Sequence, residues 1–242
     1  MDTLYISASG LIAQNQNLAL IAGNLANSQS PGYLAQVGTF TAFPTGTLIR
    51  TGSDPGVVGQ SSSGVAFGSG VDMGQSGIEQ TSNPNDLAIA GNNGFFVVRT
   101  ANGLAYTRDG QFSVDAKGNL VTSQGDFVLD QAGKPIQLKP GEPFTVSATG
   151  VISQGNTAVA TLALTDLSAT GLTALGNDLY TSPTRLPFTG QVVQSSLNTS
   201  DVELAQSMTQ MIDAQAWYQS LTQMVNEESK RLATTATLGM LS

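Results

Sequence analysis

The residues best suited to acid–base or metal chemistry are aspartates, because the sequence contains no histidine and no cysteine. The absence of both residue types excludes thiol catalysis, disulfides, zinc fingers and histidine-based proton transfer. Four aspartates in the central region could suggest a calcium site: Asp109, Asp115, Asp126 and Asp130. Their spacing does not match the calcium-loop pattern D-x-[DN]-x-[DN]-G, and aspartate beside glycine is common in turns. The sequence therefore favours turns here and predicts no metal site.

Two other patterns could belong to an enzyme. Glu79 and Asp86 could form the carboxylate pair of a glycoside hydrolase, but some such pair is expected by chance among 17 acidic residues. Gly91 and Gly94 could suggest a phosphate-binding loop, yet the sequence has neither G-x-x-x-x-G-K-[ST] nor a G-x-G-x-x-G that opens a helix. A hairpin turn explains these glycines better. We therefore expect no catalytic activity, no cofactor and no small-molecule substrate.

Composition excludes further classes of function. Only 11% of the residues are charged, the net charge is −8 and the isoelectric point is about 4.2. Nucleic-acid binding needs clustered lysine and arginine, so no nucleic-acid partner is expected. No stretch approaches the roughly 20 apolar residues of a membrane span. The first basic residue is Arg50, which does not fit a secretory signal, so we expect any export to proceed without a cleaved signal peptide.

The N-terminal segment, residues 1–32, is predicted to be a helix over residues 2–28. Leucine recurs every seven residues, which is typical of a coiled-coil seam: Leu4, Leu11, Leu18 and Leu25. The opposite face carries serine, glutamine and asparagine with almost no charge, which suits burial against neighbouring subunits better than exposure to solvent. A surface helix packed on its own domain is the alternative interpretation.

The C-terminal segment, residues 200–242, is predicted to contain a longer helix. Apolar residues again recur every seven positions: Leu204, Met211, Tyr218, Val225 and Leu232. Met208 and Met224 widen this stripe as adaptable packing residues rather than as cofactor ligands. Trp217 is predicted to be either a core residue or an anchor between subunits. We expect these seam residues to mediate assembly.

Between the helices the sequence predicts an all-β centre. Residues 33–80 are rich in Gly, Ser and Thr and are interpreted as an extended connector. In residues 81–180, turn pairs such as Asn102-Gly103 and Asp109-Gly110 separate short apolar runs at roughly ten-residue spacing, which indicates hairpins. Residues 181–199 contain two prolines and are interpreted as a linker. The predicted fold class is α+β: a central β domain flanked by two heptad helices that pair as a coiled coil.

Three motifs, in order along nearly the whole chain, resemble the flagellar rod and hook proteins. The first is similar to the family signature N-L-A-N-x-x-T-P-G-[YF] and comprises Asn24, Leu25, Ala26, Asn27, Pro31, Gly32 and Tyr33. The second, in residues 85–98, resembles the family's L-A-I-x-G-x-G-F-F segment. The third, Asp201 to Tyr218, resembles its C-terminal helix. The length fits a rod protein, of the proximal or distal type, better than a hook protein.

The resemblance implies a function. It implies a structural subunit of the bacterial flagellar basal-body rod, exported by the flagellar type III apparatus and polymerised through its terminal helices into a hollow drive shaft. The implied partners are copies of itself, other rod and hook proteins, and the export machinery. The implied location is the basal body outside the cytoplasm. The alternatives are a flagellar hook or hook-associated protein, a secreted β-rich binding module, and a peptidoglycan-cutting enzyme.

Overall fold

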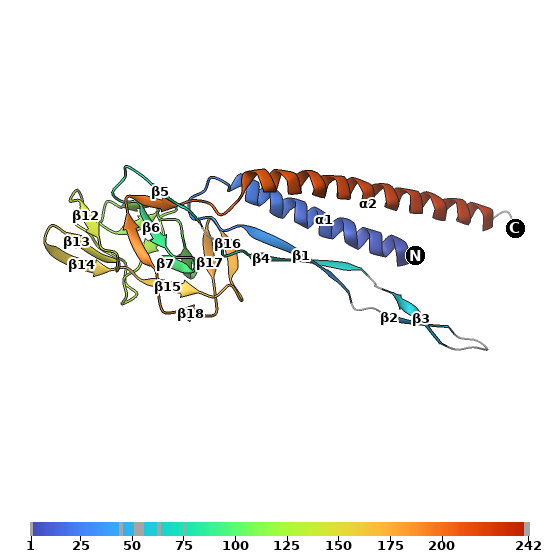
Figure 1. Cartoon of the computed structure of the whole chain (residues 1–242), viewed down its shortest axis with the longest axis horizontal. Coiled ribbons are helices and arrows are strands. Elements are labelled where there is room, and N and C mark those ends of the chain that lie inside the picture. Colours follow the sequence, from blue (N-terminus) through green and yellow to red (C-terminus); the bar gives the residue numbers. More distant parts are fainter. Residues whose placement is uncertain (1, 44–45, 51–55, 62–63, 75, 240–242) are drawn as a thin grey trace. The chain divides into compact units, whose positions relative to one another are not determined.

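The computed structural model describes residues 2–43, 46–50, 56–61, 64–74 and 76–239, and the side chains of residues 6–43, 64–74 and 76–234. The chain divides into two compact units. The helix unit comprises residues 1–25, 36–70 and 204–242, and the β unit comprises residues 26–35 and 71–203. The predicted order along the chain is confirmed: an N-terminal helix, a β-rich centre and a C-terminal helix (Figure 1). No helix among the described residues is both long and apolar enough to cross a membrane.

The helix unit contains two helices and a β ribbon. Helix α1 spans Asp2–Ala26 and helix α2 spans Leu204–Gly239, and the two lie side by side (Figure 1). The ribbon is built from β1 (Gln36–Ala42), β2 (Gly46–Arg50), β3 (Gly56–Ser61) and β4 (Val65–Val71). Strand β1 pairs with β4, and β2 pairs antiparallel with β3.

The ribbon occupies most of the segment that the sequence predicts to be an extended connector. Its β-forming residues pair across the two strands, and the rings of Phe40 and Phe67 meet edge to face with centroids 5.4 Å apart. Most of the Gly, Ser and Thr residues of β1 and β4 are exposed, and Gly38 is half-buried. A two-stranded ribbon that is largely exposed therefore has the polar, glycine-rich composition that also indicates a linker.

The β unit contains sixteen strands within the described residues. They are β5 (Ile78–Gln80), β6 (Leu87–Ala90), β7 (Gly94–Thr100), β8 (Gly103–Thr107), β9 (Phe112–Val114), β10 (Leu120–Thr122), β11 (Phe127–Val128), β12 (Phe144–Val146), β13 (Val151–Gln154), β14 (Thr157–Thr161), β15 (Leu164–Leu167), β16 (Thr173–Gly176), β17 (Leu179–Thr181), β18 (Arg185–Leu186), β19 (Gln191–Gln194) and β20 (Ser196–Asn198). The largest sheet has the order β16-β17-β8-β7-β11-β10-β9, with β15 joining β7 to β18. Strands β12, β13 and β14 form a separate sheet, and β19 pairs with β6 and β20 with β5.

Two apolar clusters form the core of the β unit. The larger cluster includes Leu87, Phe96, Phe112 and Ile152. The smaller cluster includes Leu34, Phe95, Leu129 and Tyr180, so a residue from the segment before the ribbon is part of this core. Leu34 has no exposed surface. The β unit is therefore completed by a piece of chain that lies far from it in the sequence.

The segment predicted to be a linker, residues 181–199, contains strands β18, β19 and β20. Val192 and Leu197 are buried there, because β19 pairs with β6 and β20 with β5. The prolines at 183 and 187 flank the short β18 and do not interrupt β19 or β20. Asn198 ends β20, and α2 begins six residues later at Leu204.

Candidate functional site

The most covered face of α2 is a row with alternating spacings of four and three residues. The row consists of Ser207, Met211, Ala214, Tyr218, Leu221, Val225 and Glu228. Ser207 and Ala214 are buried, and the other five are half-buried. This spacing is the one that keeps a seam on one side of a helix. Of the predicted seam residues, Met211, Tyr218 and Val225 belong to this row, whereas Leu204 is 48% and Leu232 is 38% exposed.

The most covered face of α1 is offset from the predicted leucine row. Leu11, Leu18 and Leu25 are half-buried, and the side chain of Leu4 lies outside the described residues. The most buried residues of α1 are instead Ala13, Gln14, Ile21 and Asn24. The offset arises because α1 meets the ribbon as well as α2, and the composition of residues 33–80 does not indicate a ribbon. Part of the amide-rich face is therefore buried within the chain itself.

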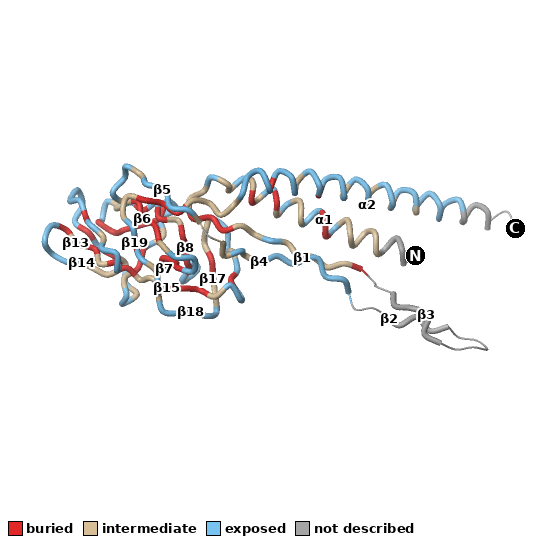
Figure 2. The backbone as a smooth tube through the Cα atoms, viewed as in Figure 1, coloured by how far each residue is buried: buried red, intermediate tan, exposed pale blue. Residues whose placement is uncertain are grey.

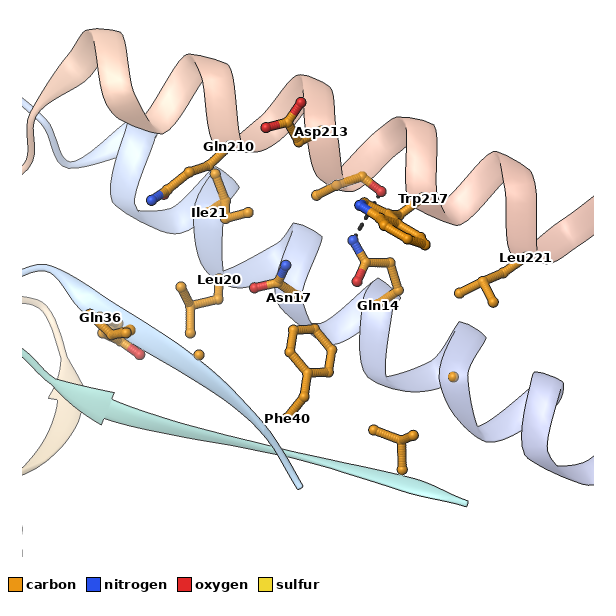
Figure 3. A pocket seen from close by; sticks show the side chains of 15 residues that line it. Gln14, Asn17, Leu20, Ile21, Gln36, Phe40, Gln210, Asp213, Trp217 and Leu221 are labelled. Atoms are coloured by element: carbon orange, nitrogen blue, oxygen red, sulfur yellow. Dashed lines mark hydrogen bonds between the residues drawn. The ribbon is translucent and has the colours of Figure 1, made fainter. Parts of the chain in front are cut away.

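Three polar side chains of α1 hydrogen-bond to α2 or to the ribbon. Gln14 Nε2 donates to the carbonyl oxygen of Ala214 in α2 at 3.0 Å (Figure 3). Ser9 Oγ accepts a hydrogen bond from the amide of Val65, the first residue of β4, at 3.1 Å. Asn24 makes two bonds to Gln36: its Oδ1 accepts from the Gln36 amide at 2.9 Å and its Nδ2 donates to the Gln36 carbonyl at 2.7 Å. The side chain of Asn24, the first asparagine of the motif, therefore supplies the two hydrogen bonds that a neighbouring strand would make to Gln36 at the start of β1.

A groove of about 670 Å³ lies between α1, α2 and β1 in the helix unit. Figure 3 shows Trp217 of α2 and Phe40 of β1 at this groove, with Gln14 and Asn17 of α1 between them. Trp217 is 66% and Phe40 is 50% exposed. The groove is thus bordered by two large aromatic side chains that the described residues leave half uncovered or more.

Further apolar side chains of α2 remain exposed on both sides of its covered row. Leu204, Met208 and Ile212 recur every four residues and are 48%, 52% and 67% exposed. At about 100° per residue they lie on one flank of the row, whereas Trp217 and Met224 lie on the other. Figure 2 shows α2 exposed over most of its length. An exposed apolar surface of this extent is typical of a protein–protein interaction site.

The second half of the motif is bound into the β unit. Gly32 N donates to the carbonyl of Asn198 at 2.8 Å, and Leu34 N donates to the hydroxyl of Tyr180 at 2.9 Å. Gly32 has φ of 70°, and a side chain there would collide with the backbone of Arg108. Glycine is required here both for its left-handed backbone and for this close approach. Pro31-Gly32-Tyr33 therefore forms a turn that places the side chain of Leu34 in the core.

Asn198 fastens this turn to the sheet. Its Oδ1 accepts from the amide of Ile89 at 2.9 Å, and its Nδ2 donates to the Ile89 carbonyl at 3.0 Å. Asn198 is 1% exposed and Ile89 has no exposed surface. As with Asn24, a side-chain amide substitutes for a missing strand, which keeps a buried peptide group hydrogen-bonded.

Arg108 is the largest fully buried side chain of the β unit, with 1% exposure. Its Nη1 donates to the carbonyl of Asn92 at 2.9 Å and its Nη2 to the carbonyl of Gly91 at 2.7 Å. Burial lowers the pKa of Arg108, and the negative charge of Asp201 opposes this shift. Burial also raises the pKa of the Tyr180 hydroxyl, which keeps it protonated. Arg108 therefore fixes the 91–92 turn behind the bound motif.

The acidic residues that could have suggested catalysis or metal binding hydrogen-bond within their own loops. Asp115 Oδ1 accepts from the amides of Lys117 and Asn119, and Asp130 Oδ1 accepts from the amide of Lys134. Asp86 accepts from Thr81 and Asn83. Within the described ranges no three metal-ligating side chains gather into a group. These contacts are those expected of turn-forming aspartates.

Asp109 and Glu79 complete this set of acidic residues. Burial raises the pKa of Asp109 to about 6, against the opposing effect of the hydrogen bond that it accepts from the Gln111 amide. The negative charges of Asp178 and Asp86 raise this pKa further. Glu79 lies on the exposed strand β5.

Sequence reasoning missed Arg108, Tyr180 and the pairing role of Asn198. Arg108 and Tyr180 resembled ordinary surface and strand residues, because burial by a segment 74 or more positions away leaves no local pattern. Asn198 lies shortly before α2, where an asparagine also suits the N-cap of a helix, so its position in the sequence does not indicate strand pairing.

Comparison with known proteins identifies relatives over almost the whole chain. Residues 88–154 match the family described as the flagellar hook protein FlgE/F/G D1 domain. The chain is 30% identical to the flagellar basal-body rod protein FlgG of Buchnera aphidicola subsp. Schizaphis graminum, covering 96% of this chain and 97% of the relative. It is 33% identical to the rod protein FlgF of Caulobacter vibrioides, covering 95% and 94%. It is 28% identical to FlgG of Bacillus subtilis, covering 96% and 97%.

Proposed function

Because the chain belongs to the family of flagellar basal-body rod proteins, of the FlgF or FlgG type, we propose that it is a structural subunit of the rod in the flagellar basal body. We propose that α1 and α2 pair as a coiled coil and that copies of the chain polymerise through these helices into a hollow, torque-transmitting shaft. The observation that carries this proposal is the apolar surface of α2 on both flanks of its covered row.

The two-sided exposure favours a polymer over a closed dimer. A two-fold dimer covers one self-complementary patch on each copy, whereas a subunit in an extended lattice uses different patches toward different neighbours. Leu204, Met208 and Ile212 lie on one flank of α2, and Trp217 and Met224 lie on the other. Covering both flanks requires a neighbour on each side of the helix, as an extended lattice supplies.

The remaining parts of the proposal follow from this role. The partners are other copies of the chain and other rod and hook proteins of the flagellar axis. The chain reaches its place outside the cytoplasm through the flagellar type III export apparatus, without cleavage of a signal peptide. We infer that it performs no catalysis, a role in line with its relatives, which are named as basal-body rod proteins.

The test replaces an exposed apolar residue of α2. Ile212 is 67% exposed, so Ile212→Asp should leave the thermal unfolding of the purified chain unchanged. In an assembled rod the same carboxylate would be buried without a partner, at a cost of several kcal/mol in every copy. We therefore expect basal bodies without this subunit, and loss of swimming, in cells that carry only the variant.

Ser220→Asp is the matched control, because it adds the same charge at an exposed polar position of α2 that lies between the two apolar flanks, on the side away from the covered row. Secretion of each variant is measured in parallel, since a subunit that is not exported cannot assemble. Normal basal bodies and normal swimming with an exported Ile212→Asp subunit would refute the assembly role of this flank.

A further inference from the structure

The chain passes between the two units four times, at residues 25/26, 35/36, 70/71 and 203/204. Inside the β unit, backbone bonds tie together the residues next to these crossings. Asp72 N donates to the carbonyl of Ala35 at 2.8 Å, and Asp201 N donates to the carbonyl of Tyr33 at 2.9 Å. Ser200 Oγ donates to the carbonyl of Asn27 at 3.0 Å. Residues beside each crossing are therefore hydrogen-bonded to residues beside at least one other crossing.

The same crossings share one apolar cluster. Leu34 is a fully buried member of the smaller core cluster, and Val71 and Met73 pack against that cluster. Tyr180 belongs to this cluster and contacts two of its members: its ring meets Phe95 edge to face with centroids 5.8 Å apart, and its hydroxyl accepts the hydrogen bond from Leu34 N. Leu34, beside the second crossing, and Val71 and Met73, beside the third, therefore pack in the same apolar cluster. The segment 26–35, which also contains the first crossing, is hydrogen-bonded to Ser200 and Asp201 beside the fourth.

We propose that the four crossings form one cooperative joint that opens as a single unit, and that Tyr180 is the residue that positions it. Loss of the Leu34–Tyr180 bond leaves a buried amide without an acceptor, which weakens the docking of the whole 26–35 segment. Asp72 and Asp201 bond to carbonyls of that segment, so they are released together with Leu34. A mechanical role for the joint rests on the proposed function. In a rod subunit, the four chain connections would carry load together rather than one at a time.

Amide hydrogen exchange on the purified full-length chain tests the joint and does not depend on rod assembly. Tyr180→Phe removes the accepting hydroxyl and keeps the ring. We expect exchange of the amides of Gly32, Leu34, Asp72 and Asp201 to rise by one common factor, about tenfold or more. The amide of Leu120, which donates to Ile136 in the other core cluster, should change less than about threefold.

Tyr106→Phe is the matched control, because it removes a hydroxyl from another buried tyrosine of the same sheet, whose ring contacts Arg185. It should leave all five amides close to their original rates. Faster exchange at Leu34 alone would show four independent fastenings and overturn the cooperative joint. An equal rise at Leu120 would show that Tyr180 supports the whole unit rather than the joint. Neither outcome bears on whether the subunit assembles into a rod.

Discussion

Replacement of Asn198 by alanine should destabilise the β unit more than any exposed substitution. The side chain is 1% exposed and makes two hydrogen bonds to the backbone of Ile89, at 2.9 and 3.0 Å. Asn198→Ala removes both partners and leaves a buried donor and a buried acceptor, each costing about 1–3 kcal/mol. The expected loss is about 2–6 kcal/mol, which lowers the Tm of a unit of this size by roughly 10 °C.

Circular dichroism during thermal unfolding measures this loss, and Asn93→Ala, at an exposed turn position, is the control. Asn198→Asp sharpens the test. At neutral pH its carboxylate still accepts from the Ile89 amide but faces the Ile89 carbonyl without a proton to donate. Its pKa in the folded chain should therefore be raised, so stability should return as the pH falls and the acid becomes a donor. A Tm of Asn198→Ala within about 2 °C of the parent, or an Asn198→Asp variant without recovery in acid, would refute the strand-substitute role.

Two further predictions concern the β unit. Burial raises the pKa of Asp109 to about 6, so between roughly pH 4 and pH 6 the folded chain holds a proton that the unfolded chain releases. The free energy of unfolding should therefore fall by about 2–3 kcal/mol as the pH rises through this window, and Asp109→Asn should flatten the fall and raise the Tm at pH 7 by about 5 °C; an unchanged pH profile of the Tm would contradict the assignment. Gly32→Ala places a methyl group against the Arg108 backbone at φ of 70°, so chymotrypsin should cleave at Tyr33 and Leu34 in the folded variant several times faster than in the parent; equal cleavage rates would show that the turn adapts.

The parts of the fold that follow from local patterns were predictable from the sequence. Heptad spacing located both helices, and turn pairs such as Asn102-Gly103 located the hairpins of the centre. The ribbon was not recognised, because a two-stranded ribbon with exposed faces has the composition of a linker. Strands β19 and β20 were missed for a related reason: their partners β6 and β5 lie about a hundred residues earlier, so nothing nearby in the sequence indicates the pairing.

The candidate site was predictable in kind more than in detail. The seam positions Met211, Tyr218 and Val225 lie on the covered row of α2, and their role in assembly stays a prediction. On α1 the leucine row gives the helix but not its most covered face, because Ser9 and Asn24 bind the ribbon. The motif residues were located by resemblance alone. Their role in binding the turn at Gly32 to the β unit follows from the contact between Gly32 and Asn198, which no local pattern predicts.

A backbone hydrogen bond closes the base of the ribbon, so the length of the ribbon does not affect the hydrogen bonds of the β unit. Asp72 N bonds to Ala35 O where the ribbon begins and ends, and β1 and β4 pair directly beyond that point. Residues added to or removed from both strands in matched pairs would keep the register at the base and leave the β unit's hydrogen bonds unchanged. The length of the ribbon can therefore change without altering the hydrogen bonds at its base.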